Sequence, residues 1–125
     1  MAKRPVGITR KCLRMILEAS RDMYPNEFGA FLTAEEGVID ELVMIPGTVM
    51  GRRHAIFQTW MLPPNMHVVG TVHSHPSGVY RPSEEDRHLF SNFSGIHIIT
   101  GYPYNEEMWA AWTNKGERVP LTIVP

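Results

Sequence analysis

Two histidines and an aspartate are spaced so that they could bind one metal ion together. The β-branched run Val68–Val72 predicts a buried strand, and it leads directly into His73 and His75. Alternate side chains of a strand share a face, so the two imidazoles point the same way. After a loop rich in proline and glycine, Ser83 and Asp86 open a predicted helix. Two imidazoles and one carboxylate suit a catalytic zinc ion, whose fourth position stays open to water.

Each part of this pattern also has a plainer interpretation. Histidines at a strand end are often polar surface residues, and Ser83 with Asp86 three positions later could be only a capping box. A bare His-x-His motif would favour the surface interpretation. The complete string is more specific: histidine, serine, histidine, seven residues, serine, two residues, aspartate. It is formed here by His73, Ser74, His75, Ser83 and Asp86, and with it the chain resembles the JAMM (MPN-plus) metalloprotease family.

The resemblance covers nearly the whole chain and is strongest to small stand-alone archaeal members. It implies one zinc ion per chain, bound by His73, His75 and Asp86. The family also places a glutamate upstream, near the start of a strand, and Glu27 lies at that place. Without the zinc motif, Glu27 would be interpreted as a solvated carboxylate in a helix-to-strand turn.

The resemblance also implies a reaction and roles for three further residues. Glu27 is expected to act as general base and then to pass the proton to the leaving amine. The Ser83 hydroxyl is expected to stabilise the carbonyl oxygen as negative charge develops. Ser74, on the other side of its strand, is expected to support the histidines. Family members cleave after the C-terminal Gly-Gly of ubiquitin or its relatives. The expected enzyme is therefore a zinc-dependent isopeptidase, with a ubiquitin-like modifier and its conjugates as partners.

Periodicity and turn residues predict an α/β fold, a single-domain mixed sheet flanked by helices. Helices are expected over 10–23, with Thr9 as the N-cap, and over about 83–93. Besides the strand that leads into the histidines, strands are expected over Phe28–Thr33, Val38–Ile45, Ala55–Met61, Ile96–Tyr102, Met108–Asn114 and Arg118–Val124. The family's fold, as the resemblance implies, is a curved JAMM/MPN sheet similar to that of cytidine deaminases.

Composition limits the other possibilities. The 125 residues fit one domain, 1–125, with a genuine apolar core. A net charge of −1 argues against a nucleic-acid partner. Cys12 is the only cysteine, which excludes an intrachain disulfide, and it is expected to pack as a small apolar residue. No signal-peptide core follows the basic start, and no run approaches the roughly 20 apolar residues of a membrane helix. We therefore expect a cytoplasmic protein without a membrane partner.

Three other functions are alternatives to the isopeptidase: a zinc deaminase, a non-catalytic scaffold and the processing of sulfur-carrier proteins. A zinc deaminase needs a Pro-Cys-x-x-Cys pair, which a single cysteine excludes. A non-catalytic MPN-type scaffold would be expected to lack motif residues that this chain keeps. Processing of sulfur-carrier proteins with a Gly-Gly tail fits the same chemistry and stays open. The segment Val49–Met61 is expected to contact the modifier's tail along a sheet edge. The pattern is compatible with a monomer or a dimer.

Overall fold

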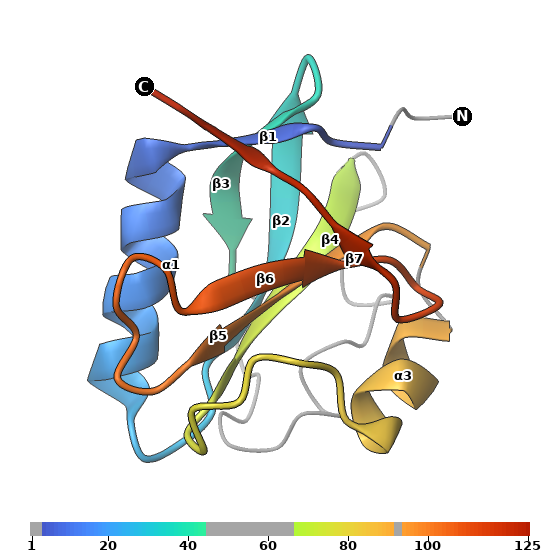
Figure 1. The fold of residues 1–125 in the computed structure, drawn as a ribbon. Helices are drawn as coiled ribbons and strands as arrows, with labels where there is room; N and C mark the ends of the chain where they lie inside the picture. The colour runs from blue at the N-terminus through green and yellow to red at the C-terminus, as the bar shows by residue number, and fades with distance from the viewer. Residues whose placement is uncertain (1–3, 45–66, 92–93) are drawn as a thin grey trace.

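A computed structural model of the chain describes residues 4–44, 67–91 and 94–125. This part of the chain forms a mixed sheet with two helices against it, as predicted (Figure 1). In chain order the elements are β1 (Gly7–Thr9), α1 (Arg10–Met23), β2 (Gly29–Glu35), β3 (Val38–Val43), β4 (Val68–His75), α3 (Glu84–Ser91), β5 (Ile96–Gly101), β6 (Trp109–Trp112), β7 (Arg118–Val119) and β8 (Thr122–Val124).

The sheet is strongly curled. Its strand order is β7-β6-β5-β4-β2-β3-β1-β8, so β7 and β8 lie at opposite edges. Only residues 120 and 121 separate these two strands in the chain, which allows a span of at most about 11 Å. Eight strands laid flat would measure roughly 34 Å across. The two edges must therefore approach each other, and Figure 1 shows the C-terminal segment crossing from β7 past β1.

Two parts of the sheet differ from the sequence-based prediction. The single strand predicted over Arg118–Val124 is wrong, because it divides at Pro120, which has no N–H to donate to a ladder. Its first part pairs with β6 and its second part with β1. The strand Gly7–Thr9 was not predicted at all. It is three residues long and pairs in parallel with β3 and β8, so it depends on partners distant in the sequence.

Helix α1 matches its prediction. The Thr9 side chain accepts a hydrogen bond from the Cys12 N–H at 3.0 Å, which caps the helix,. The buried face of the helix carries Cys12, Leu13, Ile16, Leu17 and Ser20. Burial, with smaller contributions from the charges of Asp40 and Glu41, raises the pKa of the Cys12 thiol to about 12. This thiol thus behaves as the small core residue that was expected.

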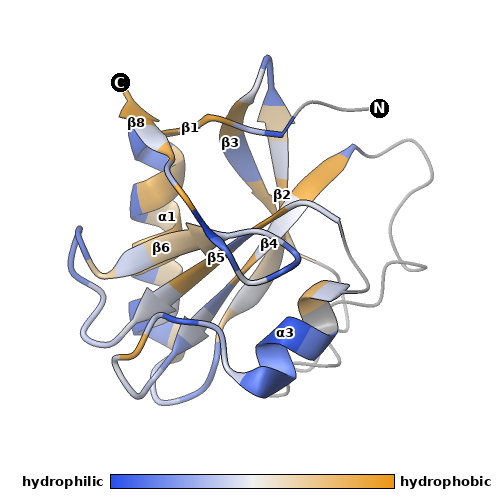
Figure 2. Cartoon of the chain, turned by 45° about the vertical axis from the view of Figure 1, so that its right-hand side comes forward, coloured by the Kyte–Doolittle hydropathy of each residue, from blue (hydrophilic) through white to orange (hydrophobic). Residues whose placement is uncertain are grey.

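The sheet separates two groups of buried side chains. On the face that α1 covers lie residues such as Val72, Ile96 and Ile98. On the other face, Phe90 of α3 packs with Ile99, Ala110 and Trp112. Trp109 packs against the first group and Trp112 belongs to the second, so these two residues point to opposite faces. Figure 2 shows that most of α3 is hydrophilic. Its polar residues Glu84, Glu85, Arg87 and His88 are exposed, whereas Phe90 is buried.

The remaining predicted elements lie partly inside and partly outside the described residues. Strands β2 and β3, both of which were predicted, pair as an antiparallel hairpin. Helix α3 covers most of its predicted range, and residues 92 and 93 of that range lie outside the described residues. The predicted strand Ala55–Met61 and the predicted contact segment Val49–Met61 also lie outside the described residues. Within the described ranges, neither helix has the length and apolar character that a membrane span requires.

Candidate metal centre

Strand β4 brings the two histidines together. Thr71, His73 and His75 alternate with Val72 and Ser74, so the two imidazoles share the face toward α3,. Their Nε2 atoms lie 3.0 Å apart. The His73 side chain is fully buried and His75 is 8 % exposed. The prediction that both rings point the same way is confirmed.

Helix α3 supplies the third group. Asp86 lies in the first turn and is completely buried. Its Oδ1 is 3.1 Å from His73 Nε2, and its Oδ2 is 3.0 Å from His75 Nε2. The capping box is present as well: Asp86 Oδ2 accepts the Ser83 N–H at 2.9 Å, and Ser83 Oγ accepts the Asp86 N–H at 3.1 Å. The capping-box interpretation of Ser83 and Asp86 is confirmed, and the cap also orients the carboxylate toward the histidines.

The donor set fits a zinc ion. One ligand atom from each of His73, His75 and Asp86 lies within 4.8 Å of the other two. The separations of 3.0–3.1 Å are close to the roughly 3.3 Å between ligands of a tetrahedral zinc. His75 Nδ1 lies 2.6 Å from the Val79 carbonyl, to which it donates as the N–H tautomer. The lone pair of Nε2 then faces the site, as a metal ligand requires.

Burial and charge favour the ionisation states that bind a metal. Burial lowers the pKa of His73 below its usual range, although the neighbouring Asp86 acts in the opposite direction. A neutral imidazole is the ligand form. For Asp86, burial alone would raise the pKa, but the close contacts with His73 and His75 and the hydrogen bond from the Ser83 N–H hold the pKa of this carboxyl far below its usual range. The site thus holds a carboxylate beside neutral imidazole at ordinary pH.

A buried stack lies behind the histidines, and sequence reasoning missed it. The ring of Phe90 is 6.1 Å from the ring of His73 and stacks on His97, with centroids 4.0 Å apart. His97 Nδ1 in turn lies 2.7 Å from Thr71 Oγ1. A polar residue inside the apolar run of β5 was the available signal. The stack limits the orientations open to His73.

The pairing of β2 with β4 explains the place of Glu27. Gly29 pairs with His73 in the antiparallel ladder, so continuing the register by two residues sets Glu27 opposite His75. Directly opposed residues share a face. Glu27 therefore lies on the metal side, although it precedes the histidines by more than forty residues.

Ser74 lies on the α1 face of β4, on the other side of the strand from the histidines, as predicted. Its Oγ accepts the Phe28 N–H at 2.8 Å, and its own N–H donates to the Phe28 carbonyl at 2.9 Å. Ser74 thus holds the backbone next to Glu27, because a side-chain hydroxyl continues the ladder where the strand ends.

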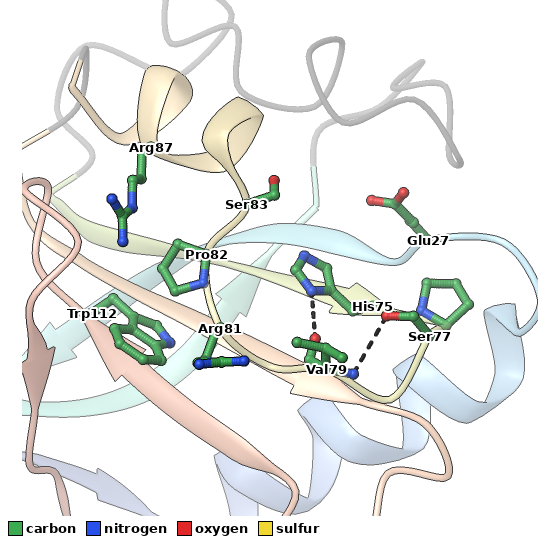
Figure 3. Close-up of a pocket in the computed structure, with 10 residues that line it drawn as sticks. Glu27, His75, Ser77, Val79, Arg81, Pro82, Ser83, Arg87 and Trp112 are labelled. Carbon is green, nitrogen blue, oxygen red and sulfur yellow. Dashed lines mark hydrogen bonds between the residues drawn. The ribbon is translucent and has the colours of Figure 1, made fainter.

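An open cleft of about 470 Å³ leads to the site (Figure 3). Its walls bring together His75 and the two predicted catalytic residues, Glu27 and Ser83. Ser83 Oγ accepts one hydrogen bond within its own turn, and a hydroxyl can also donate one. Three lining residues were not predicted to be functional: Arg81, Arg87 and Trp112. They come from the motif's spacer, from α3 and from β6, so only the folded chain brings them together.

Sequence comparison finds one protein family and one relative that match most of this chain. A family model described as prokaryotic homologues of the JAB domain matches residues 9–115. A protein of Haloferax volcanii named as a probable metalloprotease is 36 % identical over 129 aligned positions, which cover 95 % of this chain and 80 % of that protein.

Solved structures agree in fold. A JAB1/MPN domain protein from Archaeoglobus fulgidus has 44 % identity and a TM-score of 0.79, covering 95 % of this chain and 99 % of that one. A structure described as a JAMM metalloprotease-like zinc site in the proteasome and signalosome has 41 % identity and the same TM-score, covering 97 % and 99 %. A Desulfitobacterium hafniense protein shares the fold at 19 % identity, with a TM-score of 0.67 over 94 % and 92 %. The family match over residues 9–115 and the relative of 36 % identity together show that this chain belongs to the JAB (JAMM/MPN) family.

Proposed function

We propose that the protein is a zinc-dependent isopeptidase that hydrolyses the amide bond after the C-terminal Gly-Gly of a ubiquitin-like protein modifier. The observation that carries the proposal is the convergence of Glu27 and Ser83 on the cleft beside the buried His73, His75 and Asp86. The Haloferax volcanii relative named as a probable metalloprotease supports the same reaction class.

The residues of the chain divide the reaction between them. Zinc, when bound by His73, His75 and Asp86, supplies Lewis-acid chemistry and makes water a stronger nucleophile. The Glu27 carboxylate takes a proton from the attacking water as the water oxygen bonds to the carbonyl carbon. The Ser83 hydroxyl donates to the carbonyl oxygen as charge accumulates there. When the carbon–nitrogen bond breaks, Glu27 passes its proton to the leaving amine, so that acid and amine products form.

The depth of the metal centre supports a glycine tail. His73 and Asp86 are completely buried, and only a small part of His75 reaches the cleft. A substrate backbone must therefore approach the cleft floor closely, and side chains on the reacting residues would interfere. Glycine permits such an approach because it has no Cβ.

The test compares the wild type with Glu27→Gln at matched zinc content. The substrate is a ubiquitin-like modifier joined through its terminal glycine to a lysine amine, and the products are measured by mass spectrometry. We expect kcat to fall roughly 10²–10⁴-fold in the variant, because the carboxamide cannot transfer the proton. Glu41→Gln, which changes an exposed glutamate of β3, is the control and should retain full activity.

The outcomes separate the alternatives. Equal hydrolysis by the wild type and Glu27→Gln would remove Glu27 from the mechanism. Zinc-loaded wild type that cleaves no Gly-Gly conjugate would overturn the substrate assignment. A chain that neither binds zinc nor hydrolyses the conjugate would overturn the enzyme assignment and favour a binding scaffold.

A further inference from the structure

The cleft beside the metal centre is basic at one end. Arg81 and Arg87 line it together with Trp112. A second hollow of about 290 Å³ shares Val79, Arg81 and Trp112 with this cleft and adds Arg118. The second hollow therefore adjoins the first. In Figure 3, Arg87 and Trp112 lie at the opposite end of the cleft from Glu27. We call the part lined by Arg81, Arg87, Trp112 and Arg118 the arginine groove.

Contacts within the fold hold this groove in place. Trp112 and Arg118 are directly paired across β6 and β7, so their side chains share a face. The Trp112 indole N–H donates to the Tyr80 carbonyl at 3.2 Å, which ties the loop that carries Arg81 to β6. The three arginines thus come from three separate elements and meet around one buried tryptophan.

A glycine makes room for Arg87. A Cβ built at Gly116, in the turn between β6 and β7, would lie 3.1 Å from Arg87 Nε and 3.6 Å from its Cγ and Cδ. Gly116 also has a φ of +80°, which a side chain would disfavour. The guanidinium can therefore rest against the turn backbone and face the groove.

The charge of the groove is not balanced within the described part of the chain. No described ion pair joins a carboxylate to Arg81, Arg87 or Arg118; those present join Asp86 to the histidines. Glu27, at the far end, is the carboxylate among the residues that line the two hollows. The concentration of positive charge contrasts with the net charge of −1 for the whole chain. Guanidinium groups favour carboxylates, which accept two parallel hydrogen bonds from one arginine.

We propose that the arginine groove binds an acidic segment of the protein substrate within a few residues of the scissile bond. This inference rests on the proposed function, because it assigns the groove to the substrate of the same metal centre. The groove then determines which conjugates are hydrolysed efficiently: aspartate or glutamate side chains near the bond contact the arginines and place the amide over the site. Charge complementarity of this kind acts on specificity and on the rate of association.

The test uses matched Gly-Gly isopeptide substrates. One set carries two glutamates near the bond, either before the Gly-Gly or around the acceptor lysine, and the other carries glutamines at the same positions. All have amidated C-termini. We expect wild-type kcat/KM to be about tenfold higher for the acidic member of one pair. The ratio should fall toward one in the double variant Arg81→Gln/Arg87→Gln and in wild type as the salt concentration rises from about 0.05 M to 0.5 M.

Three further variants distinguish charge from folding effects. Arg87→Lys keeps the positive charge and should retain most of the preference, whereas Arg87→Glu should favour the glutamine substrate. Arg14→Gln changes an exposed arginine of α1 outside the groove and should keep the wild-type ratio. Equal ratios in wild type and the double variant would overturn the proposal. The proposal would also be overturned if the arginines favoured cleavage only of a glutamine substrate with a free C-terminal carboxylate. The groove would then recognise a chain terminus and not an acidic segment.

A binding measurement separates this inference from the proposed function. Fluorescence anisotropy of labelled glutamate and glutamine peptides is recorded with the zinc-loaded Glu27→Gln protein, with and without the arginine changes. Tighter binding of the glutamate peptide that is lost with the arginines supports the groove, even if wild type hydrolyses neither peptide and the proposed function fails. Equal binding of both peptides overturns the groove, even if hydrolysis occurs.

Discussion

The two faces of β4 differ in the kind of side chain that they bury, although residues of the two faces alternate along a single strand of eight residues. Toward α1, Val72 lies in an apolar core with Ile96 and Ile98 of β5. Toward α3, the same strand presents His73 and His75, which are as deeply buried as much of the core. Burial alone therefore does not distinguish structure from function in this strand. What differs is the kind of contact that each buried side chain makes.

The apolar face is stabilised by many weak and non-directional contacts, so a substitution there mainly changes the free energy of unfolding. The polar face consists of a few directional contacts, each between specific atoms of His73, His75, Asp86 and Val79. Such groups are costly to bury unless every partner is present. We therefore expect mutations on the two faces to produce separable effects, and three experiments test that separation.

The largest effect is expected for His75→Ala, on the polar face. The change removes one of the three proposed zinc ligands and the ring that lies 3.0 Å from Asp86 Oδ2. Zinc content should fall well below one per chain, and hydrolysis should fall at least about 10³-fold, because several kcal/mol of transition-state stabilisation depend on the metal. Zinc is measured by mass spectrometry of metals and folding by circular dichroism. His67→Ala, at an exposed histidine just before β4, is the matched control. Full zinc occupancy in His75→Ala would contradict the ligand assignment.

For Ile98→Ala, on the apolar face, a large effect is expected on stability and none on zinc binding. Ile98 is completely buried, and its truncation should lower the free energy of unfolding by about 2–5 kcal/mol in urea denaturation. The folded fraction should still bind zinc stoichiometrically. Ile98→Val provides a graded control, with a loss of about 1 kcal/mol. Loss of zinc from protein that is still folded would show that the two faces are not separable.

The smallest effect is expected for Ser74→Ala, which connects the two faces. The hydroxyl accepts the buried Phe28 N–H, so its loss should lower the free energy of unfolding by about 1–3 kcal/mol. Because Glu27 is the neighbour of Phe28, kcat should also fall, up to roughly 10²-fold if the carboxylate is displaced, while zinc remains bound. Ser74→Thr keeps the Oγ and should restore both quantities. A fall in stability without a change in kcat would show that Ser74 does not position Glu27.

Much of the local structure was predictable because its signals are local. Thr9 and the apolar spacing behind it were sufficient to predict α1. The alternation in β4 predicted that His73 and His75 share a face. These features depend on neighbours within a few residues, which the sequence displays directly.

Features that depend on distant pairing were missed or misassigned. The three residues of β1 become a strand through their pairing with β3 and β8. The Ser74 hydroxyl accepts a hydrogen bond from Phe28, just before β2, and so joins residues 46 positions apart in the chain. The stack of Phe90 on His97 joins α3 to β5, and no spacing in the sequence indicates it.

The sequence by itself determined the chemistry of the metal centre: two imidazoles on one strand face, a carboxylate in the first turn of a helix, and the loop length between them. Those properties follow from strand and helix geometry over short distances. Only the tertiary structure decided which groups surround that chemistry. The register of β2 against β4 sets Glu27 opposite His75, and the pairing of β6 with β7 places Trp112 beside Arg118. Both results arise from hydrogen-bonded pairing and curling of the sheet, which join residues far apart in the chain.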